Sequence, residues 1–248
     1  MHSAMDPAAR SRTYGGFLHL EELLSLQESP SGHHDEMLFF TAHQIYELWF
    51  KILLHELERA RDAMLADDVP WALYCLRRVR VIERVLCEQI DVLATISPGS
   101  FQQFRGGLYS SSGLQSAQFR EIEFLSGLKD PAHLRRDDLT DAERERLTRR
   151  LAEPALTEAF DMLRVRRGSP DLAEILRSEV IDDDLGRLAE ALIDHDEGFS
   201  QWRYRHVRMV ERIIGGRDGT GGSSGVGYLR STLAKRFFEE LWSVRGRL

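Results

Sequence analysis

Hydrophobic positions recur every three or four residues along most of the chain, as they do on one face of an α-helix. Three segments keep this pattern over the length of a long helix: 34–66, about 70–95 and 182–214. Period-two runs of β-branched residues, which would indicate strands, are not found in the sequence. The pattern therefore predicts an all-α fold, a helical bundle of three long helices with additional short helices.

Each of the first two long helices has an apolar stripe. The stripe of the first comprises Phe39, Ala42, His43, Tyr46, Phe50, Leu53 and Leu57. The predicted stripe of the second comprises Trp71, Leu76, Val79, Ile82, Leu86, Ile90 and Leu93. Asp67 and Asp68 predict a tight turn between the two helices, and Pro70 suits the first turn of a helix.

Shorter apolar patterns fill the rest of the chain. They predict short helices at 18–27, within 97–113, at 114–127, two or three over 130–180, and around 227–243. A clear linker is not found, so we expect a single helical domain over 13–248, with 130–180 as a cap segment. Residues 1–12 are interpreted as a disordered start or a remnant of expression.

Composition narrows the functional classes. A chain of 248 residues that is 42% hydrophobic can bury a large core. The formal net charge of −7 disfavours nucleic acid as a partner, and no apolar run is long enough for a membrane span. Cys75 and Cys87 lie about 18 Å apart on one predicted helix, too far for a disulfide, which fits a reducing, cytoplasmic location.

Two histidines lie on stripes that should face the core. His43 belongs to the first long helix, and His206 lies on the third among Phe199, Trp202, Met209, Val210 and Ile213. Each could be a structural histidine bonded to a carbonyl, or a ligand such as the axial imidazole of a haem iron. Together they favour a pocket for a flat apolar cofactor. The opposite face of the third helix is assigned Arg203, Arg205, Arg208 and Arg212.

Two further elements could contact a ligand. The loop "GGRDGTGGSSGVG" has no lysine and follows a helix, so it is not a phosphate-binding loop. It is either a flexible surface loop or an ordered loop that presents backbone N–H groups and the Thr220 hydroxyl. Arg105, which follows Phe101 and Phe104, is either an ordinary surface arginine or a clamp for the carboxylate of an aromatic amino acid.

The clusters "HHDE" (33–36) and "DHDE" (194–197) could supply ligands to a non-haem metal. We interpret both mostly as helix caps and solvated faces.

Several motifs resemble the haem-dependent tryptophan 2,3-dioxygenase family. They are "YGGFL", "HHDEMLFFTAHQIYELWFKILLHEL", "FRGGLYSSSGLQSAQFREIEFL" and "WRYRHVRMVERIIGGRDGTGGSSGVGYL". The resemblance covers about half of the chain, over 14–66, 97–127 and 199–243, and the last motif is the most specific. It implies an all-helical fold, haem b and a homotetramer, and a reaction in which O2 opens the indole C2–C3 bond of L-tryptophan to give N-formylkynurenine.

The resemblance also implies roles for individual residues. His206 matches the axial ligand of the haem iron, and His43 matches a distal histidine that hydrogen-bonds the indole N–H. Arg105 matches the carboxylate-binding residue. The remaining matches are Phe39 and Phe101 in the substrate pocket, Thr220 at the ammonium and carboxylate, Ser112 near the haem, and Tyr14, Phe17 and Leu18 in a segment that reaches a neighbouring subunit's pocket.

The chain departs from the family pattern at some positions. Phe101 and Phe17 stand where tyrosine is usual, and the segment between the second and third motif blocks is short. An alternative is therefore a relative that oxygenates a substituted tryptophan in secondary metabolism, by insertion of a single oxygen to an oxindole. A third hypothesis is a helical bundle that binds a ligand or partner without catalysis.

Overall fold

The computed structural model describes residues 13–108, 111–168, 171–177, 183–220 and 224–248. Every regular element in these ranges is helical, which confirms the predicted all-α class. The expected disordered start at 1–12 lies outside the described residues, and the single-domain division stays a prediction.

The three long helices begin and end close to their predicted bounds. They are α4 (His34–Leu65), α5 (Val69–Leu93) and α11 (Asp184–Ile214). Each begins at a side-chain N-cap, since His33, Asp68 and Asp183 accept hydrogen bonds from backbone N–H groups of the first turn. Gly215 ends α11 as its C-cap, with a positive φ of 60° that favours glycine.

The short elements connect and flank these helices. The α-helices are α2 (Tyr14–Phe17), α3 (Leu20–Leu24), α6 (Pro98–Phe104), α7 (Ala117–Ser126), α8 (Asp141–Ala152), α9 (Leu156–Arg166), α10 (Leu172–Arg177), α12 (Val226–Ser231) and α13 (Glu239–Ser243). The 3-10 helices are η1 (Arg105–Leu108), η2 (Gly113–Gln115), η3 (Pro131–Arg135) and η4 (Val244–Arg247). The predicted short helix at 18–27 is present as α3, but it is shorter than expected, because His19 adopts φ +52° and the helix begins only after it, at Leu20.

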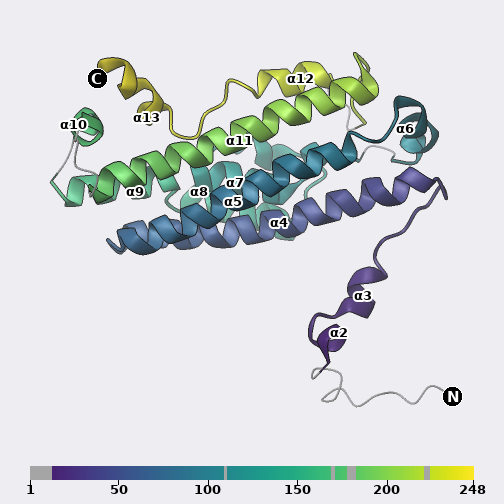
Figure 1. Ribbon diagram of the computed structural model, residues 1–248, viewed down its shortest axis with the longest axis horizontal. Helices are drawn as coiled ribbons and strands as arrows, with labels where there is room; N and C mark the ends of the chain where they lie inside the picture. Colours follow the sequence, from purple (N-terminus) through teal and green to yellow (C-terminus); the bar gives the residue numbers. More distant parts are fainter. Residues whose placement is uncertain (1–12, 109–110, 169–170, 178–182, 221–223) are drawn as a thin grey trace.

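The core of the molecule lies between the long helices. α4 and α11 both pack along α5, and Figure 1 shows the three running side by side, with α7 and α8 behind them. The buried stripes of α4 and α5 meet at fully buried side chains such as Leu53, Leu57 and Val79. Within the described ranges, no helix has both the length and the apolar character that crossing a membrane requires.

One predicted core residue is exposed. Trp71 is 43% accessible and stacks on Tyr74, with ring centroids 5.1 Å apart, instead of packing into the core. The buried stripe of α5 starts with Val69 and Ala72, which lie two residues before and one residue after Trp71. An amphipathic helix buries only one face, and Trp71 lies outside the buried face of α5.

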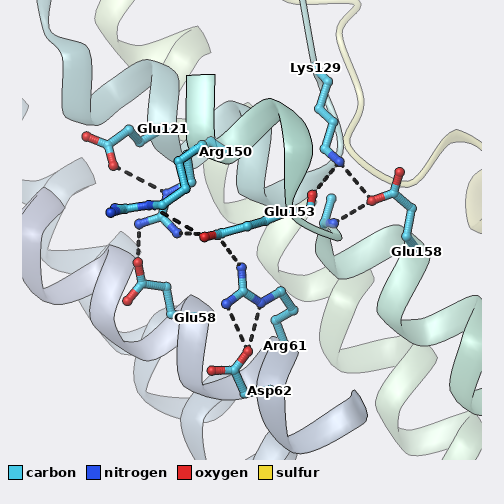
Figure 2. Close-up of polar contacts among 10 residues, drawn as sticks. Glu58, Arg61, Asp62, Glu121, Lys129, Arg150, Glu153 and Glu158 are labelled. Carbon is cyan, nitrogen blue, oxygen red and sulfur yellow. Dashed lines mark hydrogen bonds and ion pairs between the residues drawn. The ribbon is translucent and has the colours of Figure 1, made fainter. Parts of the chain in front are cut away.

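The described helices of the segment 130–180 dock on the side of the bundle through buried apolar side chains of α9, such as Leu156 and Phe160, and through charged contacts. Arg150 of α8 is 4% exposed and forms ion pairs with Glu58 of α4, Glu121 of α7 and Glu153 (Figure 2). Lys129 donates to the carbonyl of Glu153 and to Glu158 of α9 at 2.7 and 2.8 Å. These pairs bind α8 and α9 to α4 and α7.

The N-terminal helices α2 and α3 project away from the bundle (Figure 1). The chain that follows them is bound to α4 at two points. Gln44 donates a hydrogen bond to the carbonyl of Leu26, and the carboxylate of Glu36 accepts three from Ser29 and Ser31. The projecting arm (residues 13–26) therefore leaves the body from a fixed base.

Candidate active site

A cavity lies between α4, α6, α7, α11 and α12, where the glycine-rich loop follows α11. Much of its lining is aromatic or aliphatic, including Phe50, Phe119 and Ile213. The sequence-predicted site residues that line it are Phe39, His43, Phe101, Arg105, Ser112, His206 and Thr220. An apolar cavity with a few convergent polar groups is typical of a cofactor or substrate site.

His206 presents an imidazole to this cavity from α11. Burial, together with the nearby His43, lowers the pKa of His206 to about 4, so the ring is neutral near pH 7. In the part of the chain that the structure describes, no group hydrogen-bonds to the ring. A neutral imidazole with a free nitrogen, in an apolar cavity, has the chemistry of an iron ligand.

His43 faces the same cavity from α4, and its protonation is fixed by a local contact. Its Nδ1 lies 2.7 Å from the carbonyl oxygen of Phe39, one turn earlier. A carbonyl can only accept, so Nδ1 carries the proton and Nε2 is a hydrogen-bond acceptor. Burial lowers the pKa of His43, which keeps the ring neutral.

An aromatic wall stands beside His43. The ring of Phe39 lies 4.3 Å from the His43 ring, and 5.7 and 5.6 Å from Phe101 and Phe104, measured between centroids. Phe101 and Phe104 are almost completely buried, so these rings are held in place. Such a wall suits a flat aromatic ligand.

Arg105 begins η1 and Thr220 lies in the glycine-rich loop, and hydrogen bonds join the two segments. Arg105 donates a hydrogen bond from Nη2 to the carbonyl of Asp218, and the Thr220 hydroxyl donates to the carbonyl of Ser111 at 2.7 Å. Gly225 has φ +59°, and a Cβ there would lie 2.4 Å from the carbonyl oxygen of Arg217. Gly225 thus packs closely against the start of the glycine-rich loop, and a cationic group, Arg105, and a hydroxyl group, Thr220, both line the cavity.

Ser112 reaches the cavity from the loop between η1 and η2. Its backbone N–H donates to the side-chain oxygen of Gln115 at 2.9 Å, which folds this loop locally.

A buried charged cluster on the α7 side of the cavity is absent from the predicted site residues. Arg120 and Arg203 both bind Glu123, at 2.6 and 3.1 Å, and all three are at most 3% exposed. Although burial opposes ionisation, the two guanidinium groups hold the pKa of Glu123 below its ordinary value. The assignment of Arg203 to the outer face is wrong. Its spacing of four from both Phe199 and Val207, which are buried, is the signal that could have placed it inside.

The "DHDE" cluster is also misassigned, because His195 and Asp196 are buried. His195 bonds through Nδ1 to Glu83 at 2.6 Å and through Nε2 to Ser126 at 2.9 Å. Asp196 accepts hydrogen bonds from the C-terminal segment. α11 therefore buries part of a cluster that was expected to be solvated.

The interpretation of the "HHDE" cluster as a helix cap and solvated face is confirmed only in part. His33 is the N-cap of α4, as predicted, and its side chain accepts from the N–H of Asp35. Glu36 is buried instead of solvated. Among the described residues, no group of three or more histidine, cysteine, aspartate or glutamate side chains is arranged to hold a metal ion.

The structure does not bring the arm residues to the cavity. Tyr14, Phe17 and Leu18 are 78%, 73% and 41% exposed and do not line it.

Comparison with known proteins agrees with this geometry. The family profile described as "Tryptophan 2,3-dioxygenase" matches residues 2–172 and 172–248. A protein from a Nocardioides species with that name is 50% identical over 95% of this chain and 94% of its own length. A protein of the same name from Herpetosiphon aurantiacus is 44% identical over 97% of this chain and 100% of its own length. Another, from Kineococcus radiotolerans, is 42% identical over 95% of this chain and 91% of its own length. This chain belongs to the tryptophan 2,3-dioxygenase family.

Proposed function

We propose that this chain uses haem b and O2 to open the indole C2–C3 bond of L-tryptophan, giving N-formylkynurenine. Family membership and relatives named tryptophan 2,3-dioxygenase support this activity. The observation that carries it is the single cavity that His43, Arg105, Thr220 and His206 all line.

His206 is the residue that would hold the haem iron. Its ring is neutral and lacks a hydrogen-bond partner in the described ranges, and the cavity walls around it are largely apolar, which suits a porphyrin. Ser112 is proposed to contact the same group. When bound, haem supplies the electron chemistry that activates O2, and the protein supplies orientation.

His43 orients the indole ring. Because Nδ1 is committed to the carbonyl of Phe39, Nε2 can accept a hydrogen bond from the indole N–H. The lowered pKa keeps this nitrogen unprotonated near neutral pH. Phe39 and Phe101 pack against the flat face and edge of the ring and exclude water there.

Arg105 and Thr220 hold the amino-acid end of the substrate. The guanidinium suits a planar, bidentate contact with a carboxylate, and the hydroxyl can accept a hydrogen bond from the ammonium group. Each side chain already donates to a backbone carbonyl, which fixes its position and leaves other guanidinium N–H groups and the hydroxyl lone pairs for the substrate. Fixing both ends of tryptophan sets which indole carbons react.

We propose that the working enzyme is a homotetramer. Tyr14, Phe17 and Leu18 of each arm then contact the substrate pocket of a neighbouring subunit, which would bury side chains that are exposed in one copy.

The test is a single-turnover reaction with haem-loaded, reduced protein. Mixed with L-tryptophan and O2, it should give a product that carries two additional oxygen atoms by mass spectrometry and the absorbance of N-formylkynurenine. A His206→Ala variant should lose the haem Soret band. A product with one added oxygen, or haem-loaded protein that leaves tryptophan unchanged, would contradict the proposal.

A further inference from the structure

Trp202 and His206 form an unusually flat pair on α11. They are one turn apart, with ring centroids separated by 5.1 Å and planes inclined by 6°. Among the ring pairs of the described residues this is the smallest angle, since the other stacked pairs incline by 23° and 25°. A nearly parallel arrangement limits the rotation of both rings about their side-chain bonds.

Trp202 is itself held on its other sides. Its ring contacts Tyr46, Phe119 and Phe199 at centroid distances of 6.1, 5.4 and 5.9 Å. Tyr46 is fixed by a hydrogen bond from its hydroxyl to the carbonyl of Leu86 at 2.8 Å, and Phe199 is 1% exposed. Aromatic residues of α4, α7 and α11 thus hold the indole of Trp202 in place, and α5 holds one of them, Tyr46.

The two cavity histidines are oriented by different contacts. His43 is fixed by a hydrogen bond from Nδ1 to the carbonyl four residues earlier. His206 has the corresponding carbonyl, that of Trp202, but in the described ranges no hydrogen bond to it or to another group forms. Histidines that bind metals usually donate their second N–H to a carboxylate or carbonyl, which fixes the ring and makes it a stronger donor.

We infer that Trp202 is a positioning residue that sets the ring plane of His206 by stacking, in place of a hydrogen bond to the second ring nitrogen. This inference rests on the proposed function, which takes His206 as the iron ligand. Because no acceptor among the described residues strengthens the imidazole, we take it as a weak electron donor, and a weak donor favours ferrous over ferric iron. Trp202 therefore helps to keep the haem in the state that reacts with O2.

Replacing the indole of Trp202 should change the iron–histidine bond without removing it. In Trp202→Leu the freed ring can turn and donate to the carbonyl of residue 202. The iron–histidine stretching band of the ferrous protein, measured by resonance Raman spectroscopy, should then broaden and move to higher frequency, and the reduction potential should fall. Trp202→Phe, which keeps a flat ring, should restore both. Trp71→Leu removes an exposed tryptophan outside the cavity and should leave both unchanged.

Different results would overturn different claims. A Trp202→Leu protein that binds haem with the band and potential of the unsubstituted protein would overturn the positioning role alone. Equal shifts in Trp202→Leu and Trp202→Phe would also overturn it, because loss of volume would then be the cause. If Trp202→Leu does not retain haem, Trp202→Met takes its place in the comparison. Absence of the band from the unsubstituted protein would overturn the haem assignment and this inference with it.

Discussion

The neutral imidazole of His206 makes the stability of the haem-free protein depend on pH. Its folded pKa of about 4 lies below the ordinary value of 6.5. Between these values the unfolded chain binds a proton that the folded chain does not. The contribution of His206 to the free energy of unfolding is therefore complete above pH 6.5 and is lost as the pH falls towards 4. This contribution is at most about 3 kcal/mol. Water in the cavity reduces this limit.

The variant His206→Leu cannot titrate at this position and serves as the reference. We expect the free energy of unfolding, measured with urea between pH 7 and 4, to fall less steeply for the variant than for the unsubstituted protein. Other titrating groups are common to both and cancel in the difference. Identical slopes would show that His206 is protonated in the folded state as readily as in the unfolded chain.

Phe101 leaves the carboxylate end of the proposed substrate site one hydroxyl short of the family pattern. The side chain is 7% exposed and lines the cavity, so we expect a para hydroxyl to be accessible to a ligand there. We expect Phe101→Tyr to lower the KM for L-tryptophan on the order of threefold to tenfold, the effect of one hydrogen bond. Tryptamine, which lacks the carboxylate, is the matched substrate and should show no gain. A gain for both substrates would place the new hydroxyl elsewhere.

Single residues could be placed from the sequence where the local pattern decides their side of a helix. His43 and His206 share stripes with aromatic neighbours, and both face the cavity. Arg203 and Asp196 were misplaced because charged residues are buried only when a partner comes from another element. Glu123, the partner of Arg203, lies on α7, and helical spacing along α11 contains no information about it.

At the scale of elements, Asp196 of α11 holds the C-terminal segment. Its Oδ2 accepts hydrogen bonds from the backbone N–H groups of Phe237 and Phe238, at 3.0 and 3.2 Å, and from Nε1 of Trp242 at 2.9 Å. Asp196→Ala leaves these buried donors without an acceptor and should cost roughly 3–5 kcal/mol. Urea unfolding measures the loss, and limited proteolysis should show early cleavage after residue 235.

The exposed Asp194 is the control for this change. It lies on the same helix, so Asp194→Ala should alter stability by less than about 0.5 kcal/mol. Equal effects of the two substitutions would mean that helix propensity, and not docking of the C-terminal segment, explains the loss.

Elements were predictable to the extent that their patterns are long. α4, α5 and α11 start and end within a few residues of the predicted bounds, since an apolar stripe of many turns averages out single exceptions. The stretch 18–27 is too short for this averaging, and its helix is limited to Leu20–Leu24, because it begins only after His19, which is in the left-handed region. At the start of α5 the predicted buried face is wrong. The small side chain of Ala72 contributes little to a hydrophobic pattern, although it is fully buried.

At the scale of the whole molecule, the arm carries apolar side chains that a single copy of the chain leaves exposed. Tyr14 and Phe17 are more than two-thirds exposed, and α2 and α3 stand clear of the bundle (Figure 1). The carboxylate of Glu36 and the amide of Gln44 fix the base of the arm, so its direction is set by the fold. In the proposed tetramer these apolar side chains complete a neighbour's pocket, and this makes an experiment on mixed oligomers decisive.

Two defective variants should complement each other if arm and pocket come from different chains. Phe17→Ser damages the arm and His206→Ala the pocket, and each homo-oligomer should have little activity. In co-expressed hybrids, intact arms of His206→Ala chains can meet intact pockets of Phe17→Ser chains, so tryptophan oxidation should rise above the sum of the separate proteins. The control is a mixture of the two purified proteins without subunit exchange, which should show only that sum. If hybrids isolated with two affinity tags are no more active than the mixture, the arm does not serve a neighbouring subunit, and the exposure of Tyr14 and Phe17 needs another explanation.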